Sequence, residues 1–188
     1  MTMWAPTQIA DKENLVRTAD RRMMWHGMFL FLIGLVTGMQ ERRFKNMRMA
    51  LSAHLEGVMN GTFLIAVGAI WGHVDLTPRV EKAARWTALY GAYGNWLFTT
   101  VGAALGTAAA NPILSQGHHG KPWQERIAGA GFRSVAYSIL VAVMLLLWGL
   151  ARGKPLQDNA VGSHDSAVSG PLPGDGSGSS GSRVGVAR

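Results

Sequence analysis

A histidine, a glutamate and an asparagine, His54, Glu56 and Asn60, stand close together in one strongly apolar stretch of the chain. An imidazole can bind a metal ion or move a proton, and an asparagine amide both donates and accepts hydrogen bonds. Uncompensated polar side chains are costly in an apolar medium, and ionisable residues inside a membrane segment usually line an interior, pair or serve a function. We therefore treat these three residues as a candidate site.

A single histidine such as His54 has three common uses inside a membrane segment. It can be a hydrogen-bonded packing residue, part of a proton path, or an axial ligand of haem iron. Composition alone ranks packing first. His26 would lie about nine residues, or ~14 Å, from His54 along the helix axis, so one iron could not bind both. The pair His118 and His119 is the remaining competitor, although histidines in such a loop are more often solvated.

Helical geometry separates the three polar residues of the candidate site. His54 and Asn60 differ by about 120° of helix rotation, so both could edge one cavity. Glu56 lies about 200° from His54, which predicts that it faces a neighbouring helix or subunit. We expect its carboxylate to pair with an arginine near the membrane surface: Arg42, Arg43 or Arg48.

Four stretches of the chain are nearly free of charge, at residues 23–39, 49–72, 86–110 and 134–151, and Glu56 is their only formal charge. Each has about the 17–25 residues needed to cross a hydrocarbon core of ~30 Å. They are apolar on all sides, whereas helices of soluble bundles keep a charged face. The sequence predicts an all-α protein whose four transmembrane helices form an up-down bundle.

This topology also predicts which polar residues share a depth in the membrane. The third helix runs opposite to the second, so Thr99 comes to roughly the level of Asn60, and Asn95 lies about one turn beyond. The sequence therefore clusters Asn60, Asn95 and Thr99 near the bilayer centre. His54 is predicted at mid-leaflet.

Small and aromatic residues support the membrane interpretation. Glycines recur at four-residue spacing, which predicts close helix packing, and Gly57 and Gly61 are also candidates to make room for a ligand. Four tryptophans mark helix ends on one predicted face, as in an interfacial aromatic belt. They are Trp25, Trp71, Trp86 and Trp148.

Charge and composition define the remaining organisation. The net charge of +7 comes largely from basic residues that flank the apolar stretches, which indicates lipid headgroups rather than nucleic acid. A slight excess of Lys and Arg favours cytoplasmic termini. We expect a polar N-terminal segment at 1–22, a membrane domain at 23–151 and a disordered Gly/Ser-rich tail at 152–188. The absence of cysteine excludes disulfides and thiolate metal sites.

Three segments, at residues 25–27, 50–62 and 86–96, resemble the hydroxylaminobenzene mutases. They read Trp-His-Gly, Ala-Leu-Ser-Ala-His-Leu-Glu-Gly-Val-Met-Asn-Gly-Thr and Trp-Thr-Ala-Leu-Tyr-Gly-Ala-Tyr-Gly-Asn-Trp. The resemblance extends over about residues 23–149 and leaves out both tails. Mutases of this family convert hydroxylaminoarenes to 2-aminophenols in bacterial nitroaromatic breakdown. The resemblance implies a small aromatic substrate and a place in the bacterial inner membrane.

The chain is more distantly similar to the styrene oxide isomerases, four-helix membrane proteins that form trimers and bind haem b between subunits. This resemblance implies a homo-oligomer, with a trimer favoured. It makes His54 the axial ligand of the haem iron and places Asn60 toward the substrate. Asn95 matches an asparagine of both groups. Thr99 stands where the isomerases use a tyrosine, a departure that weakens an epoxide-isomerase assignment.

Taken together, the resemblances imply an isomerase that converts hydroxylaminobenzene-type arenes to 2-aminophenols, with ferric haem as a Lewis acid. Asn60, Asn95 and Thr99 are the expected catalytic residues. One alternative is a haem-dependent epoxide isomerase acting on styrene oxide. Others are a non-catalytic b-type membrane haem protein, and a metal-free acid–base rearrangement that uses His54 and Glu56.

Overall fold

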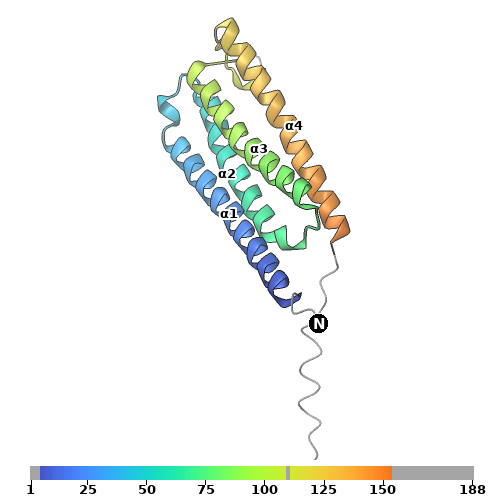
Figure 1. The fold of residues 1–188 in the computed structure, drawn as a ribbon. Coiled ribbons are helices and arrows are strands. Elements are labelled where there is room, and N and C mark those ends of the chain that lie inside the picture. Colours follow the sequence, from blue (N-terminus) through green and yellow to red (C-terminus); the bar gives the residue numbers. More distant parts are fainter. Residues whose placement is uncertain (1–4, 109–110, 154–188) are drawn as a thin grey trace, which may run out of the picture. The chain divides into compact units, whose positions relative to one another are not determined.

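The computed structural model describes residues 5–108 and 111–153, with side chains from residue 20 onward. This part of the chain consists of four α-helices and three short 3-10 turns, without a strand, which confirms the all-α prediction (Figure 1). The predicted Gly/Ser-rich tail lies almost wholly outside the described residues. The helices are α1 (Ala5–Met39), α2 (Met47–Ile70), α3 (Pro78–Leu105) and α4 (Pro122–Arg152).

Helix boundaries follow from local sequence signals. The side chain of Asn46 caps α2 by accepting a hydrogen bond of 3.1 Å from the backbone N–H of Met49. Both α3 and α4 begin with a proline, Pro78 and Pro122, which costs no backbone hydrogen bond in the first turn. Gly106 ends α3 with a φ of 70°, a left-handed conformation that favours glycine. In contrast, α1 begins at Ala5, well before the apolar stretch predicted for it.

Glycines bring α1 and α2 into direct backbone contact. A Cβ atom added to Gly34 would lie 2.8 Å from the Cα of Gly57, and one added to Gly27 would lie 2.7 Å from the carbonyl oxygen of Gly61. Such contacts allow two helices to approach more closely than any side chain permits. The prediction of close packing is confirmed, but Gly57 and Gly61 make room for α1 rather than for a ligand.

Successive helices run in opposite directions and pack side by side (Figure 1). Between α2 and α3, for example, Glu56 contacts Asn95, whereas Trp71, directly after the end of α2, contacts Glu81, nearer the start of α3. Within the described part, α1 also touches α3, but no extensive contact joins α1 to α4. The four helices therefore do not close into a ring within one chain.

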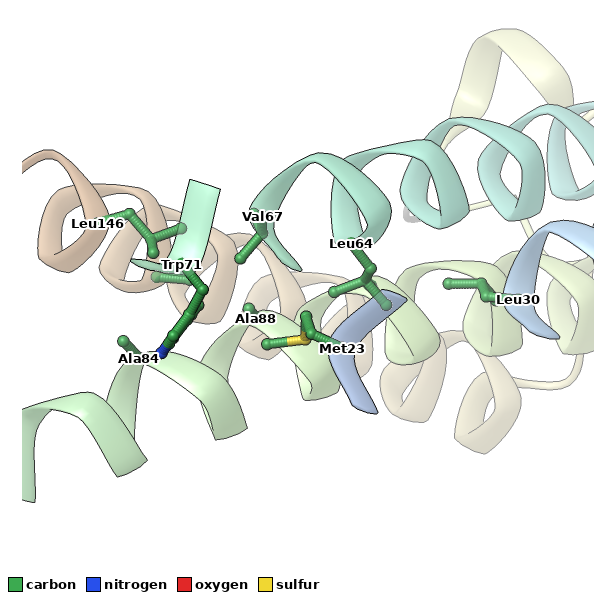
Figure 2. Close-up of a cluster of buried hydrophobic side chains, with 10 residues drawn as sticks. Met23, Leu30, Leu64, Val67, Trp71, Ala84, Ala88 and Leu146 are labelled. Atoms are coloured by element: carbon green, nitrogen blue, oxygen red, sulfur yellow. The ribbon is translucent and has the colours of Figure 1, made fainter. Parts of the chain in front are cut away.

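The larger core cluster draws side chains from all four helices (Figure 2). It includes Met23 and Leu30 of α1, Leu64 and Val67 of α2, Ala84 and Ala88 of α3, and Leu146 of α4. Alanines dominate on the α3 side, and their small size lets α2 and α4 approach it.

Trp71, which directly follows the end of α2, also belongs to this core. Its side chain is only 3% exposed, and its Nε1–H donates a hydrogen bond of 3.2 Å to Glu81. The guanidinium carbon of Arg85 lies 4.4 Å from the centre of the indole ring. The 3-10 turn after α2 directs this indole inward, a change of direction that a straight-helix projection does not include. Trp25, Trp86 and Trp148, in contrast, are exposed.

Many large apolar side chains face outward from the described helices, among them Leu32, Leu55 and Leu147. Exposed apolar surface of this extent is unusual for a monomeric soluble protein. Among the described residues, three segments are long and apolar enough to cross a membrane: Asp20–Met39, Met47–His73 and Pro122–Arg152. Helix α3 is not one of them, because charged residues in its first turns and polar residues along it lower its hydropathy.

Candidate active site

The side chains of three residues meet at the contact between α2 and α3. Glu56 Oε2 accepts a hydrogen bond of 3.2 Å from the amide nitrogen of Asn60, one turn further along α2. The same oxygen accepts a hydrogen bond from the amide nitrogen of Asn95 on α3. All three side chains are partly buried. The predicted proximity of Asn60 and Asn95 is therefore seen in the structure, with Glu56 between them.

The predicted pairing of Glu56 with an arginine is wrong. Among the described residues Glu56 forms no ion pair with an arginine, and its carboxylate bonds the two amides instead. Glu56 is eight residues from Arg48, or about 12 Å along the helix axis, which is beyond hydrogen-bonding reach. The prediction gave the right direction, toward a neighbouring helix, but chose the wrong partner there.

His54 lies where α2 packs against α1, not at the contact between α2 and α3. Its ring Nδ1 is 2.9 Å from the carbonyl oxygen of Gly34, and the absence of a side chain at Gly38 provides space for the imidazole. Because a carbonyl oxygen only accepts hydrogen bonds, Nδ1 is the donor, and Nε2 is the ring nitrogen left to bind a metal. Nε2 makes no hydrogen bond within the described part of the chain. This is the tautomer in which a backbone carbonyl orients a metal-binding histidine.

Within one chain, His54 and Asn60 lie at different helix contacts of α2. His54 bonds α1, whereas Asn60 joins the contact with α3. From the sequence we expected that both could edge one cavity. Their separation of about 120° around α2 instead directs them to different neighbouring helices. Thr99 is buried, and its hydroxyl donates a hydrogen bond of 2.8 Å to the backbone carbonyl of Asn95. It thus supports the helix turn that carries Asn95.

The other histidines are occupied elsewhere or lie in a loop. The Tyr93 hydroxyl donates to the His26 carbonyl at 3.1 Å, and His26 Nδ1 lies 3.2 Å from the same hydroxyl. Since α1 meets α2 with Gly27 beside Gly61, His26 is far from His54 along the axis. His118 and His119 lie in the α3–α4 connection. No group of three His, Cys, Asp or Glu residues suited to a metal ion occurs among the residues described.

Two cavities lie beside these residues, and neither is lined by His54, Asn60, Asn95 or Thr99. One of about 580 Å³ opens between α1 and α3. Another of about 330 Å³ lies between α3 and α4. The larger cavity is lined by Trp96, whose Nε1–H donates to Thr37 at 3.1 Å. The sequence analysis did not select Trp96, although it directly follows Asn95 in a segment that carries the family resemblance.

The fold and these side chains define a helical protein with three apolar segments of membrane-spanning length among the described residues and a polar cluster at the contact between α2 and α3. A model of the family described as "Styrene oxide isomerase" matches residues 19–151, which include all four helices except the start of α1 and the end of α4. The chain therefore belongs to the styrene oxide isomerase family. It is an isomerase.

Two curated relatives come from Ectopseudomonas oleovorans. The chain is 40% identical to hydroxylaminobenzene mutase HabB over 154 residues, which is 81% of this chain and 91% of that protein. It is 36% identical to hydroxylaminobenzene mutase HabA over 127 residues, 67% of this chain and 94% of that protein. No solved structure matches the chain. The family and both relatives agree with the resemblance drawn from the sequence.

Proposed function

We propose that the protein is a membrane-bound mutase that converts hydroxylaminobenzene-type arenes to 2-aminophenols. The observation that carries this proposal is the cluster of Glu56, Asn60 and Asn95 between apolar helices, in a chain 40% identical to a hydroxylaminobenzene mutase. An apolar arene partitions into lipid, so a site between membrane helices suits this substrate. We further propose that α3 is the fourth transmembrane helix and that the chain works as a homo-oligomer, with a trimer favoured.

The proposed reaction needs no co-reactant, because substrate and product are isomers. The N–O bond of the hydroxylamine breaks and a C–O bond forms at the ortho carbon of the ring. That carbon loses a proton and the nitrogen gains one. Asn60 and Asn95 would bind and orient the N–H and O–H groups of the substrate. The surrounding apolar helices would exclude water, which would otherwise react with an electron-poor ring.

His54 is the residue proposed to hold haem b. Whether His54 fits this role depends on which of its ring nitrogens is free to bind iron. Nδ1 donates to the carbonyl of Gly34, and Nε2 has no hydrogen-bond partner among the described residues, which fits a histidine that would hold the haem iron through Nε2. When bound, ferric haem would supply a Lewis-acid position that accepts an oxygen lone pair.

A second candidate function within the same family is the isomerisation of styrene oxide, favoured by the family description. Thr99 argues against it, because the resemblance places a tyrosine at this position in those isomerases. A b-type electron carrier is less well supported, since it would need a second histidine at the level of His54, and His26 bonds Tyr93 further along α1. Location in the bacterial inner membrane with cytoplasmic termini completes the proposal.

The decisive experiment gives purified, haem-replete protein hydroxylaminobenzene and, separately, styrene oxide, without a reductant. We expect 2-aminophenol from the first substrate by chromatography. Phenylacetaldehyde from styrene oxide without any 2-aminophenol would replace the mutase assignment with epoxide isomerisation.

Haem binding is tested by the Soret absorption of the purified protein. We expect His54→Ala to abolish the Soret band and the matched control His26→Ala to retain it, because His26 bonds Tyr93. A band that survives in His54→Ala would show that another residue holds the haem.

A further inference from the structure

We infer that Glu56 is a positioning residue that fixes the amides of Asn60 and Asn95 with their carbonyl oxygens turned toward the substrate. This inference rests on the proposed function and explains how the site would select a hydroxylamine over an epoxide. It begins from the hydrogen bonds to one oxygen, Glu56 Oε2, which accepts from the amide nitrogens of both asparagines.

An asparagine amide has two different edges, an NH₂ group that donates and a carbonyl oxygen that accepts. When a neighbouring oxygen accepts from the NH₂ group, the carbonyl oxygen must point elsewhere. Glu56 Oε2 therefore determines the orientation of Asn60 and Asn95 at once. Without this acceptor, either amide could turn over and present N–H groups in place of its carbonyl oxygen.

The two carbonyl oxygens set in this way remain available for a ligand. Neither Asn60 Oδ1 nor Asn95 Oδ1 has a hydrogen-bond partner among the described residues. Both residues are only partly buried, and the buried side-chain atoms left without a partner in that part are Asp20 Oδ1 and Thr107 Oγ1. The two asparagine oxygens are thus accessible at the surface of α2 and α3.

A pair of acceptor oxygens suits a substrate with two donors. Hydroxylaminobenzene carries one N–H and one O–H on adjacent atoms, whereas styrene oxide has an acceptor oxygen and no N–H or O–H. A site built to hydrogen-bond a substrate group strongly rejects an analogue that lacks it. Glu56 thereby favours hydroxylamines over epoxides, although it does not itself touch the substrate.

The test compares two replacements of Glu56 in full-length, haem-replete protein. Glu56→Gln keeps one acceptor oxygen at the same reach, but its own NH₂ group can also turn toward the asparagines. We expect its rate of 2-aminophenol formation to fall about 10-fold. Glu56→Leu removes the acceptor, and we expect a loss of ~100-fold or more, similar to removal of one oriented group at other active sites. Glu41→Gln, outside the cluster, should keep the wild-type rate.

A double-mutant cycle separates positioning from direct proton transfer. In a background that carries both Asn60→Ala and Asn95→Ala, no amides remain to be oriented, so adding Glu56→Leu should cause no further loss. A further large loss there, with Glu56→Gln as inactive as Glu56→Leu, would overturn the inference and make Glu56 an acid or base. A wild-type rate in Glu56→Leu would also overturn it.

Thermal unfolding tests the hydrogen-bonded cluster without any substrate. Glu56→Leu and Asn95→Leu should lower the melting temperature non-additively, because each removes the same hydrogen bond. Additive shifts would overturn the inference even if the enzyme is active. If the shifts are non-additive but the wild type forms no 2-aminophenol, the proposed function fails and the substrate part of this inference fails with it.

Discussion

At the scale of single residues, Asn46 joins two parts of the chain that lie far apart in sequence. Its side chain is fully buried, caps α2, and donates hydrogen bonds of 2.8 and 3.2 Å to the carbonyl oxygens of Leu114 and Ser115. Its backbone N–H donates to the carbonyl of Ala103 at the end of α3. One asparagine thus holds the start of α2 against the α3–α4 connection.

We predict that Asn46→Ala lowers the free energy of unfolding by about 1–3 kcal/mol, because it removes a helix cap and leaves the carbonyl oxygen of Leu114 unpaired, whereas that of Ser115 still accepts from the N–H of His118. Thermal unfolding in detergent measures the change. Asn111→Ala is the matched control, since the Asn111 side chain makes no hydrogen bond among the residues described. Equal melting temperatures for the two variants would contradict a structural role for Asn46.

At the scale of elements, the contact between α1 and α2 depends on glycine and also carries the candidate haem ligand. A side chain at Gly34 would meet the backbone of Gly57 and Val58 within 2.8 Å. The carbonyl of Gly34 also orients His54. Packing of these two helices and the tautomer of the histidine are therefore linked.

Gly34→Val should separate α1 from α2 and destabilise the protein by about 1–3 kcal/mol or more, as overpacking does elsewhere. It should also weaken the Soret band, because separating the helices moves the carbonyl of residue 34 away from His54. Gly72→Ala is the control, since no atom lies within 4 Å of the added Cβ. If Gly34→Val has the same melting temperature and Soret band as Gly72→Ala, helix packing at Gly34 and the orientation of His54 are not linked.

The contacts at this scale explain why sequence reasoning placed some side chains correctly and others not. Asn60 and Asn95 were predicted together because antiparallel helices of known length match their depths. The partner of Glu56 was not predictable in this way, because it depends on how far α2 is rotated toward α3. The same rotation separates His54 from Asn60. The burial of Trp71 was not predicted either, since the 3-10 turn that carries it leaves no clear signal in the sequence.

At the scale of the whole molecule, the proposed four-span topology makes a direct prediction for α3. If α3 crosses the bilayer, the 3-10 turns before α2 and after α3 lie on one face, and the α2–α3 connection lies on the other. The chain has no cysteine, so single cysteines can be introduced without a background signal. Suitable sites are exposed: Arg42, Thr77 and Gln116.

We predict that a membrane-impermeant maleimide labels Arg42→Cys and Gln116→Cys from the same side of sealed vesicles, and Thr77→Cys from the opposite side. Inverted vesicles should reverse the pattern. Labelling of all three from one side would show that neither α2 nor α3 crosses the bilayer. Labelling of Thr77→Cys together with Gln116→Cys, opposite Arg42→Cys, would leave α3 on the surface.

The sequence by itself determined the helical class, the apolar segments and the residues that could do chemistry, because membrane helices must satisfy their backbone internally and tolerate few polar side chains. Only the tertiary structure decided which of these residues meet. Helix rotation, set by glycine contacts along α1 and α2 and by alanines along α3, brings Glu56 to Asn60 and Asn95. The same packing turns His54 to Gly34. Contacts between helices depend on this rotation, which the order of residues along one helix does not specify.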